Sequence, residues 1–131
     1  VLTETKPSPE MEEDIAFGWK IAKEIASLDI GQTVVVKDKA LVAVEGMEGT
    51  DEAIKRGGKL AGAGIVAVKV SRPSQDARID LPAVGLKTIK SLVEARGRGL
   101  CFEAEKVPFL EREKAVLAAD THRISIVAKK S

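Results

Sequence analysis

The spacing of hydrophobic residues changes several times along the chain, and the first half contains both common periods. Between residues 9 and 28 apolar side chains recur every three or four positions, with Ser8 placed to cap a helix and Pro9 at its first position. This pattern predicts one long amphipathic helix. Two short β-rich runs follow, at 33–36 and 40–44, and the three polar residues between them predict a β-hairpin.

The second half alternates between helical and strand-like patterns. Thr50 is typical of an N-cap and predicts a helix through Leu60, with Gly57 and Gly58 weakening its middle. The run IVAVKV at 65–70 is continuously apolar, which suits a strand covered on both faces. Similar patterns predict helices at 86–97 and 111–121 and strands at 100–102 and 124–127.

Alternating strands and helices predict the α/β fold class. We expect a single layered domain with a mixed, mainly parallel sheet and helices on both faces, because 131 residues suffice for one core. The residues expected to be buried are Val34 to Val36, Ala43, Ile65 to Val68, Leu100, Phe102 and Ile126.

The first nine residues differ in composition from the rest. VLTETKPSP is polar and proline-containing, without the apolar core of a signal peptide. We therefore expect residues 1–9 to be a linker-like segment, residues 10–131 to be the domain, and the chain to be a piece of a longer protein. No apolar run approaches the roughly 20 residues of a membrane span, so a soluble protein is expected. A single cysteine, which allows no disulfide framework, favours a reducing cytoplasmic setting.

Composition narrows the function. The formal net charge is only +1 and aromatic residues make up 3%, so neither a global positive field nor stacking platforms favour nucleic acid as a partner. Cys101 is the single cysteine and lies between Leu100 and Phe102, which favours a buried small hydrophobe over a catalytic thiol. His122, the single histidine, follows a predicted helix end, which favours a cation at the helix dipole over a general base.

Candidate chemistry gathers in two segments that each follow a predicted strand, where ligands of α/β sheets usually bind. In the first segment, Gly46 and Gly49 let the backbone approach a ligand, and the helix start at Thr50 offers N–H groups to a phosphate. Asp51 and Glu52 have an alternative role as complements of the helix dipole. If the two preceding strands are neighbours, both segments share one cleft.

The second segment, KVSRPSQDARIDLP, mixes cations with carboxylates between two prolines that stiffen it. Lys69, Arg72 and Arg78 could neutralise a diphosphate. Asp76 and Asp80 could hold a Mg²⁺ ion or position water beside it, because this ion prefers hard oxygen ligands. An internal network of Arg/Asp salt bridges is the alternative. Dinucleotide-binding, Walker, zincin and α/β-hydrolase motifs are absent.

These segments resemble a known family. VAVEGMEGTDEAIKRGG followed by VKVSRPSQDARIDLPAVGLKTI is similar to the C-terminal half of the LpxI family of UDP-2,3-diacylglucosamine diphosphatases, and the similarity continues through GLCFEAEKVPFLEREK to ISIVAK. It covers nearly the whole chain from about Glu10. The resemblance implies Mg²⁺-dependent hydrolysis of a UDP-linked acylated sugar to UMP and the 2,3-diacylglucosamine 1-phosphate of lipid A synthesis.

The resemblance also implies roles for individual residues. Asp76 and Asp80 match the two aspartates of the family motif, as catalytic and metal-binding residues. Arg72 and Ser74 stand where lysine and glycine are expected. The implied substrate-binding residues are Lys69, Arg72, Gln75, Arg78, Glu45, Thr50 and Asp51.

The partners implied are the acylated UDP-sugar and an N-terminal domain of the same protein, with the lipid-bearing substrate between the two domains. A homodimer and a peripheral contact with the inner membrane surface are left open. The competing hypothesis is a non-catalytic module that binds a nucleotide-sugar or a phosphate. A requirement for a divalent metal distinguishes the two.

Overall fold

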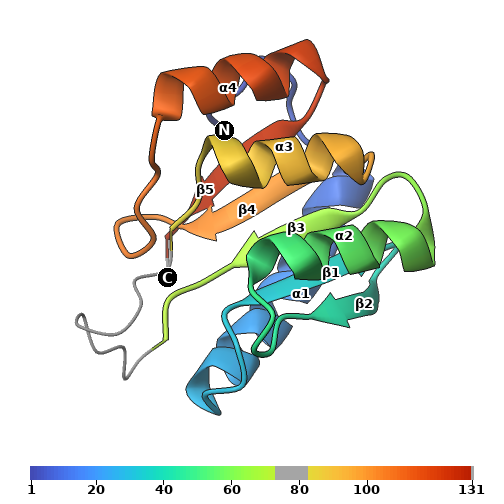
Figure 1. Ribbon diagram of the computed structural model, residues 1–131, viewed down its shortest axis with the longest axis vertical. Coiled ribbons are helices and arrows are strands. Elements are labelled where there is room, and N and C mark those ends of the chain that lie inside the picture. The colour runs from blue at the N-terminus through green and yellow to red at the C-terminus, as the bar shows by residue number, and fades with distance from the viewer. Residues whose placement is uncertain (73–82, 131) are drawn as a thin grey trace.

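A five-stranded open sheet forms the centre of the molecule. The computed structural model describes residues 1–72 and 83–130 of the chain. The strands are β1 (Thr33–Lys37), β2 (Ala40–Val44), β3 (Val66–Lys69), β4 (Gly99–Glu103) and β5 (Ser125–Lys129), in the spatial order β2-β1-β3-β4-β5 (Figure 1). β3, β4 and β5 run parallel, whereas β1 is antiparallel to both of its neighbours.

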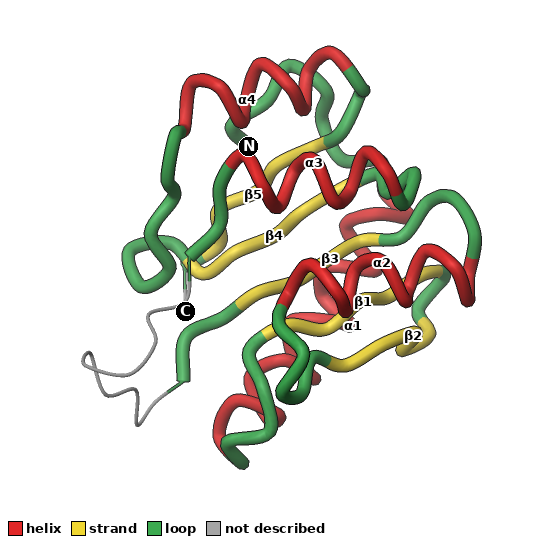
Figure 2. Tube along the Cα trace, in the orientation of Figure 1, coloured by secondary structure: helices red, strands yellow, loops and turns green. Residues whose placement is uncertain are grey.

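Four helices cover the two faces of this sheet. α1 (Pro9–Ser27) lies on one face, and α2 (Thr50–Ala61), α3 (Leu86–Glu94) and α4 (Arg112–Thr121) lie on the other (Figure 2). Ser8 caps α1 as predicted, because its Oγ accepts a hydrogen bond of 3.1 Å from the backbone N–H of Met11. The predicted α/β class, with a mixed sheet and helices on both faces, is confirmed.

Side-chain alternation divides the core into two layers. Val34, Val36 and Val68 pack beneath α1, whereas Val35 and Ala67 pack beneath α2 and α3. β1, β3 and β4 are buried on both sides, which explains their almost unbroken apolar runs, whereas Ala40 and Leu41 of the edge strand β2 are exposed. Every residue in the predicted buried set is at most 5% exposed, and that prediction is confirmed.

The direction of β1 decides where the strands end. The sequence left open whether β2 and β3 are neighbours, and they are not, because β1 lies between them. Since β1 is antiparallel to both, β2 and β3 point the same way. Their carboxyl ends therefore reach the same edge of the sheet.

The first residues of the chain lie beside β5. Leu2 N–H donates to the carbonyl of Ile126 at 2.8 Å, Ile126 N–H donates to Thr3 Oγ1 at 3.1 Å, and Ser125 Oγ donates to the carbonyl of Thr5 at 2.9 Å. The division into a linker-like segment and a domain stays a prediction. Within residues 1–72 and 83–130, no helix combines the length and the apolar character needed to cross a bilayer.

Candidate functional site

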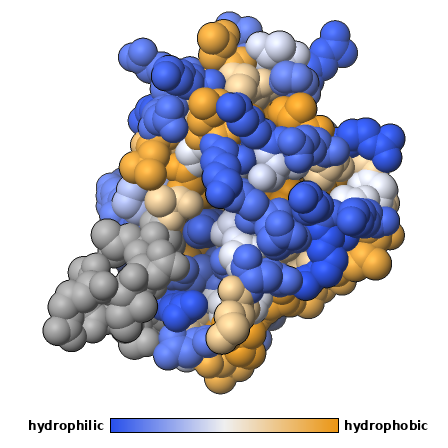
Figure 3. Space-filling model, in the orientation of Figure 1, coloured by the Kyte–Doolittle hydropathy of each residue, from blue (hydrophilic) through white to orange (hydrophobic). Residues whose placement is uncertain are grey.

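Two adjoining pockets open where helices begin next to the carboxyl ends of the strands. One, of about 470 Å³, lies at the amino ends of α2 and α3, and the other, of about 550 Å³, lies between these two helices. The face that carries α2, α3 and α4 is largely hydrophilic (Figure 3). The first pocket is lined by Gln32, Glu45, Gly49, Thr50, Asp51, Lys69, Ala83, Val84, Gly85, Leu86, Lys87, Thr88, Leu110 and Glu111.

A polar chain of contacts crosses this first pocket from β3 to α2. Lys69, the last residue of β3, is only 8% exposed, and its Nζ donates to Thr50 Oγ1 at 2.7 Å. Thr50 Oγ1 donates to Glu45 Oε2 at 3.3 Å and lies 3.1 Å from Thr33 Oγ1. Glu45 Oε1 accepts a hydrogen bond from the backbone of Gln32 at 3.2 Å. The end of β3 and the start of α2 are thus joined across β1.

Thr50 does not cap α2 as its sequence context predicted. The helix begins at Thr50 itself, and Gly49 is the N-cap with φ +92°, a backbone conformation that L side chains rarely adopt. Because Gly49 has no side chain to satisfy the first N–H groups of the helix, those groups face the pocket edge without a side-chain cap. The Thr50 hydroxyl instead accepts a hydrogen bond from Lys69 Nζ.

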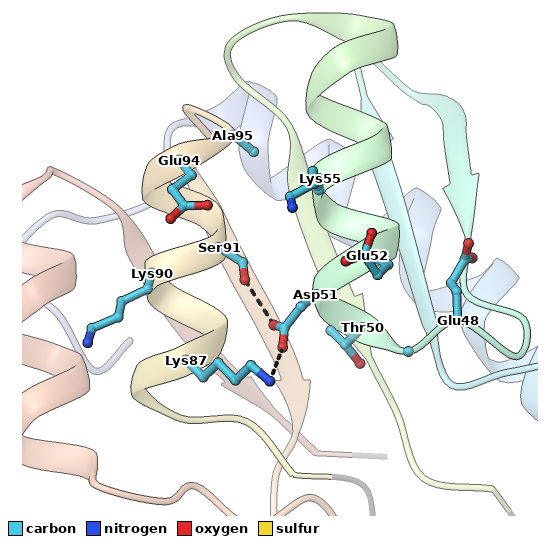
Figure 4. A pocket seen from close by; sticks show the side chains of 11 residues that line it. Glu48, Thr50, Asp51, Glu52, Lys55, Lys87, Lys90, Ser91, Glu94 and Ala95 are labelled. Carbon is cyan, nitrogen blue, oxygen red and sulfur yellow. Dashed lines mark hydrogen bonds and ion pairs between the residues drawn. The ribbon is translucent and has the colours of Figure 1, made fainter.

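Asp51 connects the amino ends of α2 and α3. Its Oδ1 accepts a hydrogen bond of 2.9 Å from Ser91 Oγ, and its Oδ2 lies 3.3 Å from Lys87 Nζ (Figure 4). Asp51 also lies in the first turn of α2, where a carboxylate complements the helix dipole. It lines both pockets and therefore marks the boundary between them.

The charged segment after β3 is described only at its two ends. At the first end, Arg72 Nη1 lies 3.9 Å from Asp29 Oδ1, and Arg72 is not among the residues that line the 470 Å³ pocket. At the other end, Ala83 to Thr88 line that pocket. Gln75, Asp76, Arg78 and Asp80 lie outside the described residues, so their placement beside Gly46 to Asp51 stays a prediction.

Sequence reasoning missed several residues at this edge. Lys87 and Thr88 line the first pocket from α3, and Leu110 and Glu111 line it from the start of α4. The rule that ligands gather at the carboxyl ends of strands, applied to the strand predicted at 100–102, would have pointed to the stretch before α4. Glu103, the last residue of β4, is fully buried on the opposite face of the sheet, and its position one residue beyond the predicted strand 100–102 was the available signal.

The structure separates the cysteine and the histidine from this edge. Cys101 is fully buried beneath α1, and this burial raises the pKa of its thiol to about 12, which confirms the predicted buried hydrophobe. His122 is the C-cap of α4, exposed, with Nδ1 3.0 Å from the carbonyl of Ala118. Since α4 begins at the pocket edge, its carboxyl end points away from the site.

Two carboxylates of the described residues could serve as donors to a metal ion. Glu45 and Asp51 bring carboxylate oxygens to the pocket, the ligand chemistry that Mg²⁺ takes. In the part of the chain that the structure describes, no three His, Cys, Asp or Glu side chains gather closely enough to hold a metal. Mg²⁺ usually keeps water and phosphate ligands and needs only one or two carboxylates, so this donor set is compatible with it.

The fold and the pocket define a class of α/β proteins that take their ligand at the carboxyl edge of the sheet, next to helix amino ends. The chain belongs to the LpxI family, since the model of the LpxI C-terminal domain matches residues 1–127. It is 37% identical over 128 residues to the UDP-2,3-diacylglucosamine pyrophosphatase LpxI of Caulobacter vibrioides. That alignment covers 91% of this chain and 45% of the relative, so the chain spans less than half of the relative's length.

Proposed function

We propose that the chain is the catalytic domain of a Mg²⁺-dependent hydrolase that cleaves the diphosphate of UDP-2,3-diacylglucosamine. Water adds to one phosphorus, the bond from that phosphorus to the bridging oxygen breaks, and UMP and 2,3-diacylglucosamine 1-phosphate leave. Membership of the LpxI family and the pyrophosphatase activity by which the Caulobacter relative is named support this proposal. The single observation that carries it is the hydrogen bond from Lys69 to Thr50, because it brings a buried cation to the amino end of α2.

Two lysines and two helix amino ends at the 470 Å³ pocket can bind a phosphate, and the carboxylates of Glu45, Asp51 and Glu111 line the same pocket. Lys69 contributes a positive charge at low exposure, and the amino ends of α2 and α3 contribute the positive ends of two helix dipoles. Lys87 adds a second amine at the rim. Glu45 fixes Thr50 through its hydroxyl and so holds the Lys69 amine at the pocket rather than at the surface.

The carboxylates that act on water are assigned from the sequence. Asp76 or Asp80 positions the attacking water, and both aspartates, together with Glu45 or Asp51, would supply oxygen ligands to Mg²⁺. When bound, this ion neutralises charge that develops on the phosphoryl oxygens. Lys69, Arg72 and Arg78 share the neutralisation, and Gln75 hydrogen-bonds the substrate.

The acylated part of the substrate lies between this domain and a further N-terminal domain. The fraction of the Caulobacter relative that this chain leaves uncovered has room for such a domain. The site opens at the sheet edge, where a second domain can close over it. Cytoplasmic location, contact with the inner membrane surface and a homodimer belong to the same proposal.

The first prediction tests this chemistry by measuring UMP release from UDP-2,3-diacylglucosamine by the full-length protein. Asp76→Ala or Asp80→Ala should lower kcat by orders of magnitude while the substrate still binds, because removing a carboxylate relieves repulsion toward phosphate. Arg78→Ala should weaken binding as well, by roughly 1.5 to 3 kcal/mol for one charge-assisted hydrogen bond. Addition of EDTA should abolish turnover in the wild type.

The same assay separates hydrolysis from simple binding. Full activity in EDTA, or unchanged rates in both aspartate variants, would exclude the mechanism. Tight binding of UDP that needs no divalent metal, without UMP release under any condition, would instead support the non-catalytic nucleotide-sugar or phosphate-binding module.

A further inference from the structure

Glu103 is a fully buried carboxylate on the face of the sheet opposite the pocket. Leu100 and Phe102 of β4 join the core beneath α2 to α4, whereas Cys101 joins the core beneath α1. Because side chains alternate along a strand, Glu103 shares the α1 side with Cys101. A buried charge is costly unless it is paired and hydrogen-bonded, so its contacts need an explanation.

The Glu103 carboxylate joins three parts of the fold. Oε2 accepts a hydrogen bond of 2.8 Å from Lys23 Nζ of α1, and Lys106 Nζ lies 3.9 Å from the same oxygen. Oε1 accepts a hydrogen bond of 2.9 Å from the backbone N–H of Ser71. One side chain therefore connects α1, the end of β4 and the chain that leaves β3.

The contact with Ser71 stands where the ladder between β3 and β4 ends. The last paired residues are Lys69 and Phe102. Val70 N–H donates to the carbonyl of Gln32 on the β1 side, so the N–H of Ser71 faces β4. There it meets the Glu103 carboxylate, while the backbone carbonyl of Glu103 accepts from Val107 N–H at 3.0 Å. The Glu103 carboxylate thus takes the place of a backbone carbonyl of β4 as acceptor for Ser71 N–H. This hydrogen bond fixes the direction in which the chain leaves β3.

We propose that Glu103 is a positioning residue, which holds the Ser71 backbone from the α1 side and thereby fixes Lys69 on the pocket side and Arg72 beyond it. Lys69 lies two residues before Ser71 and places its amine on Thr50. Lys23, whose side chain is 36% exposed, holds the carboxylate in place. The effect on substrate rests on the proposed function, whereas the effect on the backbone does not.

The backbone effect is tested by hydrogen exchange of the Ser71 amide in the full-length protein. Glu103→Ala removes the acceptor and should speed exchange at Ser71 by about tenfold or more, since hydrogen bonds to charged groups are among the stronger ones. Amides of Val34 and Ile126 in the core should keep their protection. Glu103→Gln retains an oxygen acceptor and should restore most of the protection at Ser71.

A matched control lies two residues further along. Glu105 pairs with Lys130 at 3.7 Å, but its side chain is 77% exposed, so Glu105→Ala should leave exchange at Ser71 unchanged. Unchanged exchange at Ser71 in folded Glu103→Ala would overturn the proposal. If Glu103→Ala does not fold, Lys23→Met provides the test, because it frees the carboxylate and should raise Ser71 exchange by a few fold. No change in Lys23→Met would then overturn it.

The functional effect is read from KM and kcat for UMP release, and in parallel from the affinity for UDP by calorimetry. In Glu103→Ala, displacement of Lys69 and Arg72 should raise KM about tenfold and weaken UDP binding about tenfold. If Glu103 had only a structural role, the substitution would instead lower the fraction of active protein and therefore kcat. A loss confined to kcat would overturn the positioning role. If the wild type releases no UMP but the Ser71 and UDP effects appear, the hydrolase proposal fails and the positioning role stands.

Discussion

At the scale of single residues, Lys69 and Thr50 show what a linear pattern can and cannot reveal. Both were named as site residues from the sequence, yet their contact runs across β1, between residues 19 apart in the chain. Periodicity reports which face of an element is buried and says nothing about which side chains meet across a sheet. The N-cap role predicted for Thr50 was wrong, because Gly49 takes that position and leaves the hydroxyl free to accept from Lys69.

The second prediction concerns Lys69→Met, which keeps most of the side-chain volume and removes the charge. We expect KM for the UDP-sugar to rise at least about tenfold with a much smaller change in kcat, since a charge-assisted hydrogen bond is worth roughly 1.5 to 3 kcal/mol. Steady-state kinetics on the full-length protein provides the measurement. Lys130→Met, which removes an amine from a side chain that is 80% exposed, is the control and should leave KM unchanged. A wild-type KM in Lys69→Met would exclude Lys69 from the phosphate site.

At the scale of elements, the sequence was sufficient for the nature and order of the helices and strands, and insufficient for how they pair. Apolar runs and cap residues placed each element close to its observed bounds, because those signals are local. The insertion of β1 between β2 and β3 depends on long-range pairing, which no local signal encodes. The pocket edge could be predicted from the parallel strands, but the contribution of α3 and the start of α4 could not be read from motifs.

The third prediction concerns Gly57 in α2, which the sequence suggested would weaken the helix. A Cβ at this position would lie 2.6 Å from Val35 Cγ1 of β1, so the glycine allows α2 to pack closely on the sheet. Gly57→Ala gains about 1 kcal/mol of helix propensity. It also incurs an overpacking cost of about 1–3 kcal/mol, so we expect a net loss of stability of about 1 kcal/mol.

Urea unfolding of the 131-residue chain provides the measurement for Gly57→Ala. Lys59→Ala, at an exposed position in the last turn of the same helix, touches no core residue and should change stability by only a few tenths of a kcal/mol. A gain of stability in Gly57→Ala would show that the Val35 side chain can shift to accommodate the added methyl group and that close packing of α2 on the sheet does not require the glycine.

At the scale of the whole molecule, burial of Cys101 couples the stability of the fold to alkaline pH. Burial raises the pKa of the thiol from an ordinary value of 9.0 to about 12, so between these values the unfolded chain loses this proton while the folded protein keeps it. The stabilising effect of the buried thiol is therefore complete below pH 9 and is lost as pH rises toward 12. The corresponding slope is about 1.4 kcal/mol per pH unit.

The fourth prediction isolates this coupling by comparing the wild type with Cys101→Ala between pH 8 and 11. Both proteins carry the same ionisable groups apart from Cys101, so the difference between their free energies of unfolding reports the thiol. We expect the free energy of unfolding of the wild type to fall relative to that of Cys101→Ala as pH rises above 9, as measured by urea unfolding at each pH. A constant difference across this range would mean that the thiol ionises equally well in the folded protein.

The segment from Leu2 to Thr5 also determines how shorter fragments of this chain behave. It makes hydrogen bonds to Ser125 and Ile126, which would otherwise be unpaired on the edge strand β5. An unpaired edge strand can pair with a strand of another chain. A fragment that begins at α1 would therefore expose the edge of β5 and should self-associate. The polar residues before α1, which composition alone suggests are dispensable, are expected to prevent this association.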